Sequence, residues 1–119
     1  MVRKIGVVGA GQMGNGIAHV CAVAGYDVVL ADVSDDRLTA ALATMGLNMD
    51  RQVRRGLIDE IGKAEALARI KPTVAFEEFG DCDLVIEAAT ENEDTKRKVF
   101  EELVPTLRAD VLLATNTSS

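Results

Sequence analysis

The chain of 119 residues is poor in the residues from which many binding sites are built. It has no tryptophan, and aromatic residues make up 3% of it, so it offers no platform on which nucleic-acid bases could stack. Basic residues are not in excess either, because the formal net charge is −6. Binding to a phosphate backbone needs a basic surface, so nucleic acid is not an expected partner. No apolar run approaches the length of a membrane-spanning helix, so no membrane partner is expected.

Cysteine and histidine are also scarce. Cys21 and Cys82 lie far apart, in apolar surroundings and outside any Cys-x-x-Cys pattern. This favours two small buried side chains in a reducing compartment over a disulfide, and we expect a cytoplasmic protein. The single histidine, His19, lies two positions after Ile17 in a helical pattern, which predicts a solvent-facing side chain without a catalytic role. With one histidine and no cysteine cluster, no metal site is expected.

The most informative feature that is present is an apolar stretch, residues 4–8, which runs into a glycine-rich turn. Gly9, Gly11 and Gly14 have the Gly-x-Gly-x-x-Gly spacing of dinucleotide-binding turns. The first glycine makes the bend, the second lets backbone approach a pyrophosphate, and the third lets helix and strand pack closely. Unpaired N–H groups at the start of the next helix complete a phosphate site. The predicted cofactor-binding turn consists of Gly9, Ala10, Gly11, Gln12, Met13 and Gly14.

A lone glycine motif is also typical of plain strand-to-helix turns, so the interpretation depends on the surrounding sequence. That sequence supports a dinucleotide-binding turn. Residues 12–24 have a helical pattern that Gly25 ends, and residues 28–31 form a second apolar stretch that leads to Asp32. Asp32 lies 18 residues after Gly14, where an acid that binds the adenosine ribose is expected. Its charge would repel a 2′-phosphate, which predicts NAD rather than NADP. Arg37 is expected either to brace the adenine side or to pair with a neighbouring carboxylate.

A long helix is predicted next, with Ser34 as its capping residue and Gly56 at its end. A second helical segment, near residues 62–70 and closed by Pro72, completes a helical arm over about residues 35–71. The far end of the arm carries basic side chains that can share one face: Arg51, Arg54 and Arg55. They either complement the helix dipole in solvent or bind a phosphate of a bulky ligand.

The remainder of the chain continues the alternation of strands and helices. Strands are expected at residues 73–76, 83–89 and 111–115, with a helix from about residue 92. The alternation predicts an α/β fold, a Rossmann-type doubly wound parallel sheet with an inserted helical arm, ending here after its fifth strand. Ligands of such sheets lie beyond the carboxyl ends of the strands. Glu87, at the end of a buried strand, is predicted to be either an exposed terminus or part of a site.

The glycine turn, Asp32, the 83–91 segment and the Asn-Thr-Ser-Ser stretch at 116–119 together resemble the NAD-binding domain of the 3-hydroxyacyl-CoA dehydrogenases. The resemblance runs from end to end of the chain and includes the arm. It implies NAD as cofactor and an acyl-CoA as substrate, whose 3-hydroxyl is oxidised to a ketone or formed by the reverse reduction. Under the resemblance, Ala88, Glu91, Lys96 and Asn116 line the ribose and nicotinamide end of the cofactor.

The resemblance also implies residues for the substrate. Ser118 would bind the reacting substrate oxygen beside Asn116, and Arg51 and Arg55 are candidates for the phosphates of CoA. The family's catalytic histidine and helical substrate domain lie beyond the Asn-Thr-Ser-Ser stretch. We therefore expect residues 1–119 to form an NAD-binding domain that binds NAD without efficient turnover, and its last strand to recruit a second copy as a homo-oligomer. The alternatives are a free-standing NAD-binding module and a different hydroxyacid or sugar-nucleotide dehydrogenase.

Overall fold

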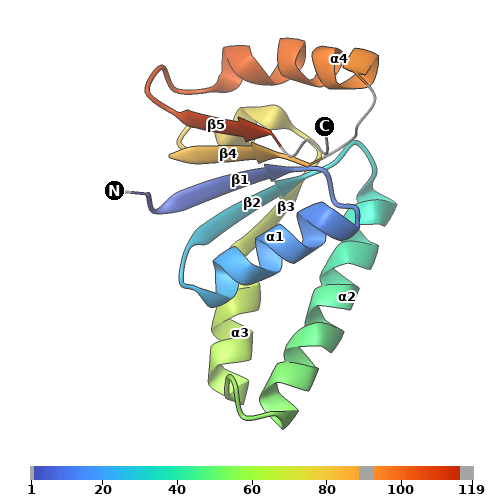
Figure 1. The fold of residues 1–119 in the computed structure, drawn as a ribbon, viewed down its shortest axis with the longest axis vertical. Coiled ribbons are helices and arrows are strands. Elements are labelled where there is room, and N and C mark those ends of the chain that lie inside the picture. The colour runs from blue at the N-terminus through green and yellow to red at the C-terminus, as the bar shows by residue number, and fades with distance from the viewer. Residues whose placement is uncertain (1, 89–92, 116–119) are drawn as a thin grey trace.

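The computed structural model describes residues 2–88 and 93–115, which form a parallel sheet with helices on both faces (Figure 1). The sheet has 5 strands in the order β3-β2-β1-β4-β5, and every pairing is parallel. The strands are β1 (Lys4–Val8), β2 (Asp27–Ala31), β3 (Ile70–Thr73), β4 (Leu84–Glu87) and β5 (Leu112–Thr115). The predicted α/β fold with a doubly wound parallel sheet is confirmed.

The helices divide between the two faces of the sheet. They are α1 (Gln12–Val23), α2 (Asp35–Arg54), α3 (Glu60–Ala68) and α4 (Glu93–Leu103), with short 3₁₀ helices η1 (Phe76–Phe79) and η2 (Val104–Thr106). Helices α1, α2 and α3 cover one face, where β1 and β2 contribute residues such as Val7 and Leu30 to the core. Helix α4 and η1 cover the other face, where Val85, Phe79 and Leu103 are buried together. None of the helices in the described part is long and apolar enough to cross a membrane.

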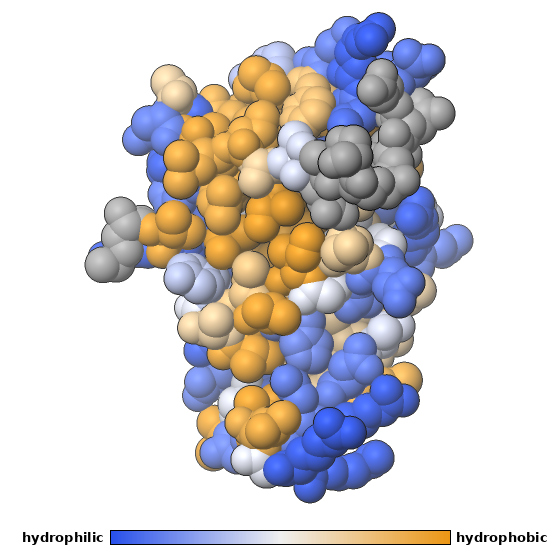
Figure 2. All heavy atoms as spheres, in the orientation of Figure 1, coloured by the Kyte–Doolittle hydropathy of each residue, from blue (hydrophilic) through white to orange (hydrophobic). Residues whose placement is uncertain are grey.

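Helix α1 packs on the sheet through its smallest residues. Gly14, Ala18 and Ala22 recur along one side of the helix and are buried, whereas Met13 is 55% exposed. Figure 2 shows the resulting hydrophobic surface over α1 and the strands beside it. The predicted outward position of His19 is wrong, because this side chain is buried and its Nε2 lies 2.8 Å from Oε1 of Gln52 on α2. Because one side of α1 lies close to the sheet, the adjacent side of the helix, which carries His19, faces α2.

The arm forms as its capping residues predict. The Ser34 hydroxyl accepts a hydrogen bond from the Arg37 N–H at the start of α2, and Gly56 follows the end of α2 with φ of 74°. The Asn15 side chain donates to the Ala41 carbonyl at 3.0 Å, and Lys63 on α3 pairs with Asp50 on α2. These contacts hold α2 against both α1 and α3.

The third strand differs from its predicted position. The sequence predicts residues 73–76 as the strand, with a helix up to residue 70, but β3 is Ile70–Thr73 and includes Pro72. β3 is an edge strand, and the carbonyls of Arg69 and Thr73 accept hydrogen bonds from β2 and the residue after it. Pro72 falls on the alternate, outward-facing positions, where its missing N–H costs no ladder bond. Pro72 is therefore a residue of the edge strand β3, and it does not end the second helix of the arm.

β5 forms the opposite edge of the sheet, and its residues are all exposed. In the described part of the chain it pairs with β4 alone, in the register Leu84↔Leu112. The pairing of this edge with a second copy of the chain stays a prediction.

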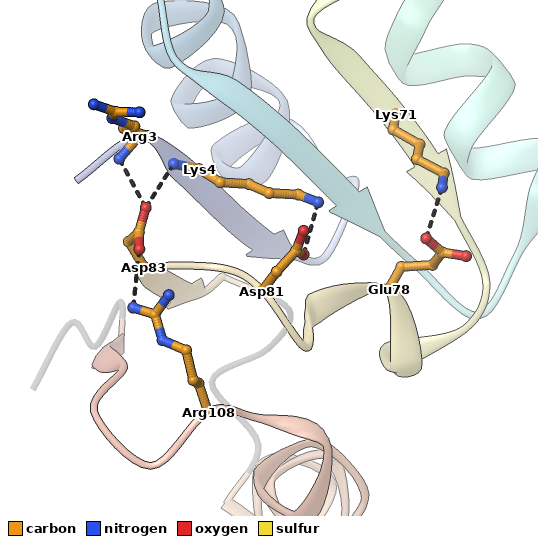
Figure 3. A network of polar contacts seen from close by, with 7 residues as sticks. All are labelled: Arg3, Lys4, Lys71, Glu78, Asp81, Asp83 and Arg108. Carbon is orange, nitrogen blue, oxygen red and sulfur yellow. Dashed lines mark hydrogen bonds and ion pairs between the residues drawn. The ribbon is translucent and has the colours of Figure 1, made fainter. Parts of the chain in front are cut away.

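A polar network fastens the amino end of the sheet, away from the glycine turn (Figure 3). The Asp83 carboxylate accepts hydrogen bonds from the backbone N–H groups of Arg3 and Lys4 at 2.8 and 3.0 Å, and it pairs with Arg108 at 2.9 Å. The Lys4 side chain in turn reaches Asp81 at 2.7 Å. The two backbone N–H groups, followed by the Arg108 guanidinium, lower the pKa of Asp83 from 3.8 to about 2. This carboxylate therefore joins β1, β4 and the segment before β5.

We predict that this carboxylate makes the fold sensitive to acid. Because the pKa of Asp83 is lower in the folded chain, its stabilisation is present above about pH 4 and is lost as the pH falls toward 2. Asp83→Asn should lower the free energy of unfolding at pH 7 and flatten its dependence on pH between about 4 and 2. Denaturant titrations at a series of pH values measure both effects. Glu101→Gln, an exposed acid on α4, is the matched control, and equal slopes for the two variants would contradict the prediction.

Candidate functional site

The carboxyl ends of three paired strands bring the predicted site residues to one rim of the sheet. Val8 of β1 is in register with Ala31 of β2 on one side and with Glu87 of β4 on the other. The residues that follow these strand ends are Gly9, Asp32 and Ala88, which therefore lie side by side. The glycine turn and the predicted ribose acid are thus adjacent although 18 residues separate Asp32 from Gly14.

The Asp32 carboxylate connects the turns that follow β1 and β2. Its Oδ2 accepts a hydrogen bond from the Ala10 N–H at 2.9 Å, and its Oδ1 accepts one from the Ser34 N–H at 3.1 Å. The side chain is 5% exposed, and the guanidinium Nε of Arg37 lies 3.7 Å from Oδ2. Each carboxylate oxygen can accept a further hydrogen bond, so the group holds the turn in place and still offers acceptor sites.

The glycine turn has the shape of a phosphate cradle. Gly9 has φ of 105°, in the left-handed region that favours glycine, and its N–H donates to the Ala31 carbonyl at 2.7 Å. A methyl group at Gly14 would lie 1.7 Å from the Gly9 carbonyl oxygen, so only glycine allows this approach of helix to turn. Gly11 caps α1 without a side-chain acceptor, and no acidic residue occupies the first turn of the helix. The N–H groups and the positive end of the helix dipole are therefore suited to an anion.

A cavity of about 280 Å³ opens beside Asp32, between the rim and α4. Its walls are mostly apolar, and the carboxylate and the guanidinium contribute charge. The residues that line it are Val8, Gly9, Asp32, Val33, Arg37, Phe76, Thr95 and Val99. An apolar cavity with a few placed polar groups is the usual form of a small-molecule or cofactor site, so the residues present are compatible with the adenosine part of a dinucleotide.

A second cavity, of about 430 Å³, lies on the other side of the glycine turn, between the start of α1 and α2. Its lining includes Gly11 and Gln12 at the turn and continues along α2 through Thr44 to Asn48. Arg37 borders both cavities. Asn48 is one helical turn before Arg51, whose guanidinium contacts the Asn48 side chain at 3.5 Å.

The buried acid at the end of β4 is paired with a lysine. Glu87 is fully buried, and its Oε1 lies 3.3 Å from Nζ of Lys96 on α4, whose side chain is 16% exposed. Glu87 is therefore not an exposed strand terminus.

The other predicted residues fall into two groups. Arg51 and Arg55 are exposed at the far end of α2, which Figure 1 shows projecting from the sheet. The ion pairs among the described residues include neither of them. Glu91, Asn116 and Ser118 lie outside the described residues, so their roles stay predictions.

The sequence interpretation did not identify five residues of the cavity beside Asp32 as site residues: Val8, Val33, Phe76, Thr95 and Val99. Val33 follows Asp32 directly and is 87% exposed, which is unusual for a valine and is a signal visible only in the structure. The sequence predicts Phe76 at the end of a strand, but in the structure it begins η1. Thr95 and Val99 are one turn apart on α4, and their helical spacing alone could have placed them on one face.

Comparison with known protein families decides which dinucleotide-binding group this is. The sequence profile described as "3-hydroxyacyl-CoA dehydrogenase, NAD binding domain" matches residues 4–119. The chain belongs to this family. It is therefore an NAD-binding domain of the 3-hydroxyacyl-CoA dehydrogenase type, as the resemblance predicted.

Relatives of this dehydrogenase domain are longer proteins. The chain is 51% identical over 119 residues to a 3-hydroxybutyryl-CoA dehydrogenase of Bradyrhizobium diazoefficiens, and it spans 41% of that protein. The crystal structure of the (S)-3-hydroxybutyryl-CoA dehydrogenase of Ralstonia eutropha superposes with a TM-score of 0.96 at 44% identity, over 100% of this chain and 42% of that one. A fatty acid oxidation complex subunit alpha of Acinetobacter baumannii is 36% identical over 118 residues, which are 99% of this chain and 16% of that protein.

The glycine cradle of the dehydrogenase domain yields a direct prediction. Gly14→Ala should lower the free energy of unfolding by about 1–3 kcal/mol or more, because the added methyl group meets backbone at 1.7 Å. Gly16→Ala is a matched control on the same helix, because a methyl group there meets nothing within 4 Å. It should stabilise the chain by about 0.5–1 kcal/mol through helix propensity. Thermal and denaturant unfolding compare the two, and equal stability of both variants would show that the turn can move away.

Proposed function

We propose that the dehydrogenase domain holds NAD along the carboxyl rim of the sheet, with the pyrophosphate at residues 9–14 and the adenosine in the cavity beside Asp32. The observation that carries the proposal is the position of the Asp32 carboxylate, which borders the cavity and also accepts the Ala10 N–H of the glycine turn. Gly11, Gln12 and Met13 offer backbone N–H groups at the start of α1, and Ala10 lies in the same turn with its N–H bonded to Asp32. The free acceptor sites of Asp32 suit the ribose hydroxyls.

The charge at the rim supports NAD over NADP. A 2′-phosphate on the adenosine ribose would approach a carboxylate that is tied to backbone and cannot turn away. Arg37 lies 3.7 Å from the same carboxylate, so part of its positive charge is already balanced. In this proposal Arg37 closes the adenine side of the cavity that it lines.

The proposed substrate is a 3-hydroxyacyl-CoA, and bound NAD supplies the hydride acceptor for its oxidation. Ala88, Glu91, Lys96 and Asn116 are proposed to line the nicotinamide end, and Ser118 to donate a hydrogen bond to the reacting oxygen. What supports this is family membership, together with the positions of Ala88 and Lys96 at the rim.

The arm is proposed to hold the CoA part of the substrate. The cavity of about 430 Å³ begins at the glycine turn and ends at Asn48, one helical turn from Arg51. Arg55, the residue that directly follows α2, lies about one turn further from the rim. A chain of polar and basic groups thus leads from the rim to the end of the arm, where the guanidinium groups suit phosphates.

The 119 residues themselves are proposed to bind the cofactor without efficient turnover. Proton exchange with the substrate oxygen suits a histidine, and the single histidine of the sequence, His19, is buried between α1 and α2 with Gln52 as its partner. Full activity of this chain with acetoacetyl-CoA and NADH would overturn this part of the proposal.

Asp32→Ala tests the cofactor assignment. The variant should bind NADH about tenfold more weakly or worse, because a charge-assisted acceptor of the ribose is lost. NADPH should lose nothing or gain affinity, since the repulsion is removed and Arg37 remains. Calorimetric titration with both nucleotides measures the ratio. Asp36→Ala, an exposed acid in the first turn of α2, is the control. A ratio of NADH to NADPH affinity that the Asp32 substitution leaves unchanged would contradict the assignment.

Arg51→Glu combined with Arg55→Glu tests the substrate assignment. The double variant should bind CoA more weakly by about tenfold at low salt, and by less as salt screens the charges. Arg97→Glu, an exposed arginine on α4 across the sheet, should leave CoA affinity unchanged. If the double variant and the control bind CoA equally well, the arginines serve only to complement the end of α2.

A further inference from the structure

One ion pair at the rim places a lysine at a helix position that an apolar side chain could also fill. Lys96 begins a stripe along α4 that continues with Val99, Phe100 and Leu103 at helical spacing, and these three pack in the core beneath the helix. An apolar side chain at residue 96 would continue the stripe. The structure has an ammonium group there, with 16% of the lysine side chain exposed.

The position on the helix is also electrostatically unfavourable for a lysine. The described part of α4 is Glu93–Leu103, so Lys96 lies nearer to the positive end of the helix dipole than to the negative end. Cations are stabilised at the opposite end of a helix. The position of Lys96 therefore needs a compensating partner.

Glu87 supplies that partner from the end of β4. It points from the same face of the sheet as Val85, toward α4, and its Oε1 lies 3.3 Å from the Lys96 Nζ. The carboxylate is fully buried, so a ligand cannot touch it. Burial of a charge costs free energy even when it is paired, and an apolar pair is often as stable. Such a pair is consequently better explained by what it positions.

The pair adjoins the surfaces that face a nucleotide. Because β1 lies between β2 and β4, Glu87 and Ala88 are on the opposite side of Gly9 from Asp32 and the proposed adenosine cavity. A dinucleotide with its pyrophosphate at the glycine turn would place its nicotinamide half on that side. Ala88, the neighbour of Glu87, lies beside Gly9 at the rim and donates its N–H to the Val8 carbonyl at 2.8 Å. The ion pair thus ties the start of α4 to the strand end from which the rim is built.

We propose that Glu87 is a positioning residue that holds the Lys96 ammonium at the rim for the nicotinamide half of the dinucleotide. The inference rests on the proposed function and assigns a role to a residue that the ligand does not reach. Glu87 acts through Lys96, so its effect on binding disappears when Lys96 is absent.

The test is a double-mutant cycle on the 119-residue chain, read by calorimetric titration with NADH and with AMP. Glu87→Gln keeps the shape of the side chain and removes its charge, and it should weaken NADH binding by about tenfold. Lys96→Met should do the same, and the double variant should bind no worse than Lys96→Met. AMP, which lacks the nicotinamide half, should bind all variants equally. Lys98→Met, an exposed lysine on α4, is the matched control and should change neither titration.

A second pair of variants separates positioning from packing. Glu87→Asp retains the charge but withdraws it by one methylene, and it should also weaken NADH binding. Lys96→Arg in the same chain restores the reach of the pair and should recover the affinity.

The outcomes are distinguishable from a failure of the proposed function. Absence of NADH binding by the unmodified chain overturns the proposed function. If Glu87→Gln binds NADH as tightly as the unmodified chain, the role of Glu87 alone is overturned. The same holds if Glu87→Gln still weakens NADH binding in the Lys96→Met background. If neither Glu87 variant unfolds cooperatively, Glu87 is a folding determinant, and the positioning role is overturned as well.

Discussion

The hydrogen bond from the Ala10 N–H to the Asp32 carboxylate is the contact on which the rim depends. It joins the turn after β1 to the turn after β2, and the Ser34 N–H holds the second oxygen of the same carboxylate. The glycine turn is therefore fixed by a charged acceptor from the neighbouring strand. The same carboxylate borders the proposed adenosine cavity, so the group that organises the cradle is also the one proposed to favour NAD over NADP.

The arrangement of the arm depends on the close approach of α1 to the sheet. Glycine and alanine at residues 14, 18 and 22 leave little space between helix and strands, so the adjacent polar side chains of Asn15 and His19 meet α2. Both are hydrogen-bonded there, to the Ala41 carbonyl and to Gln52. The long helix consequently leaves the rim in a defined direction. The groups that the proposal assigns to the CoA part of a substrate keep a fixed relation to the glycine turn.

Charged groups have different tasks at the two ends of the sheet. At the amino end, Asp83 and Arg108 satisfy backbone N–H groups and one another, and this network holds strands together. At the carboxyl end, Asp32 and Glu87 are almost or fully buried, and each has a basic partner beside a cavity or a strand end. Buried charge is expensive in a fold of this size, so its concentration at the rim favours a role in binding over one in stability.

Local patterns in the sequence determined the parallel α/β fold, the glycine turn, the acid at Asp32 and the Ser34 cap, because spacing and residue type alone specify these features. Contacts between distant segments decided the rest. Pro72 can lie in β3 because β3 is at the edge of the sheet, where the proline nitrogen needs no hydrogen-bond partner. His19 is buried because α2 covers it. The Glu87–Lys96 pair and the walls of the cavities likewise exist only after β4 and α4 have packed, since burial of a charge depends on which chain segments surround it.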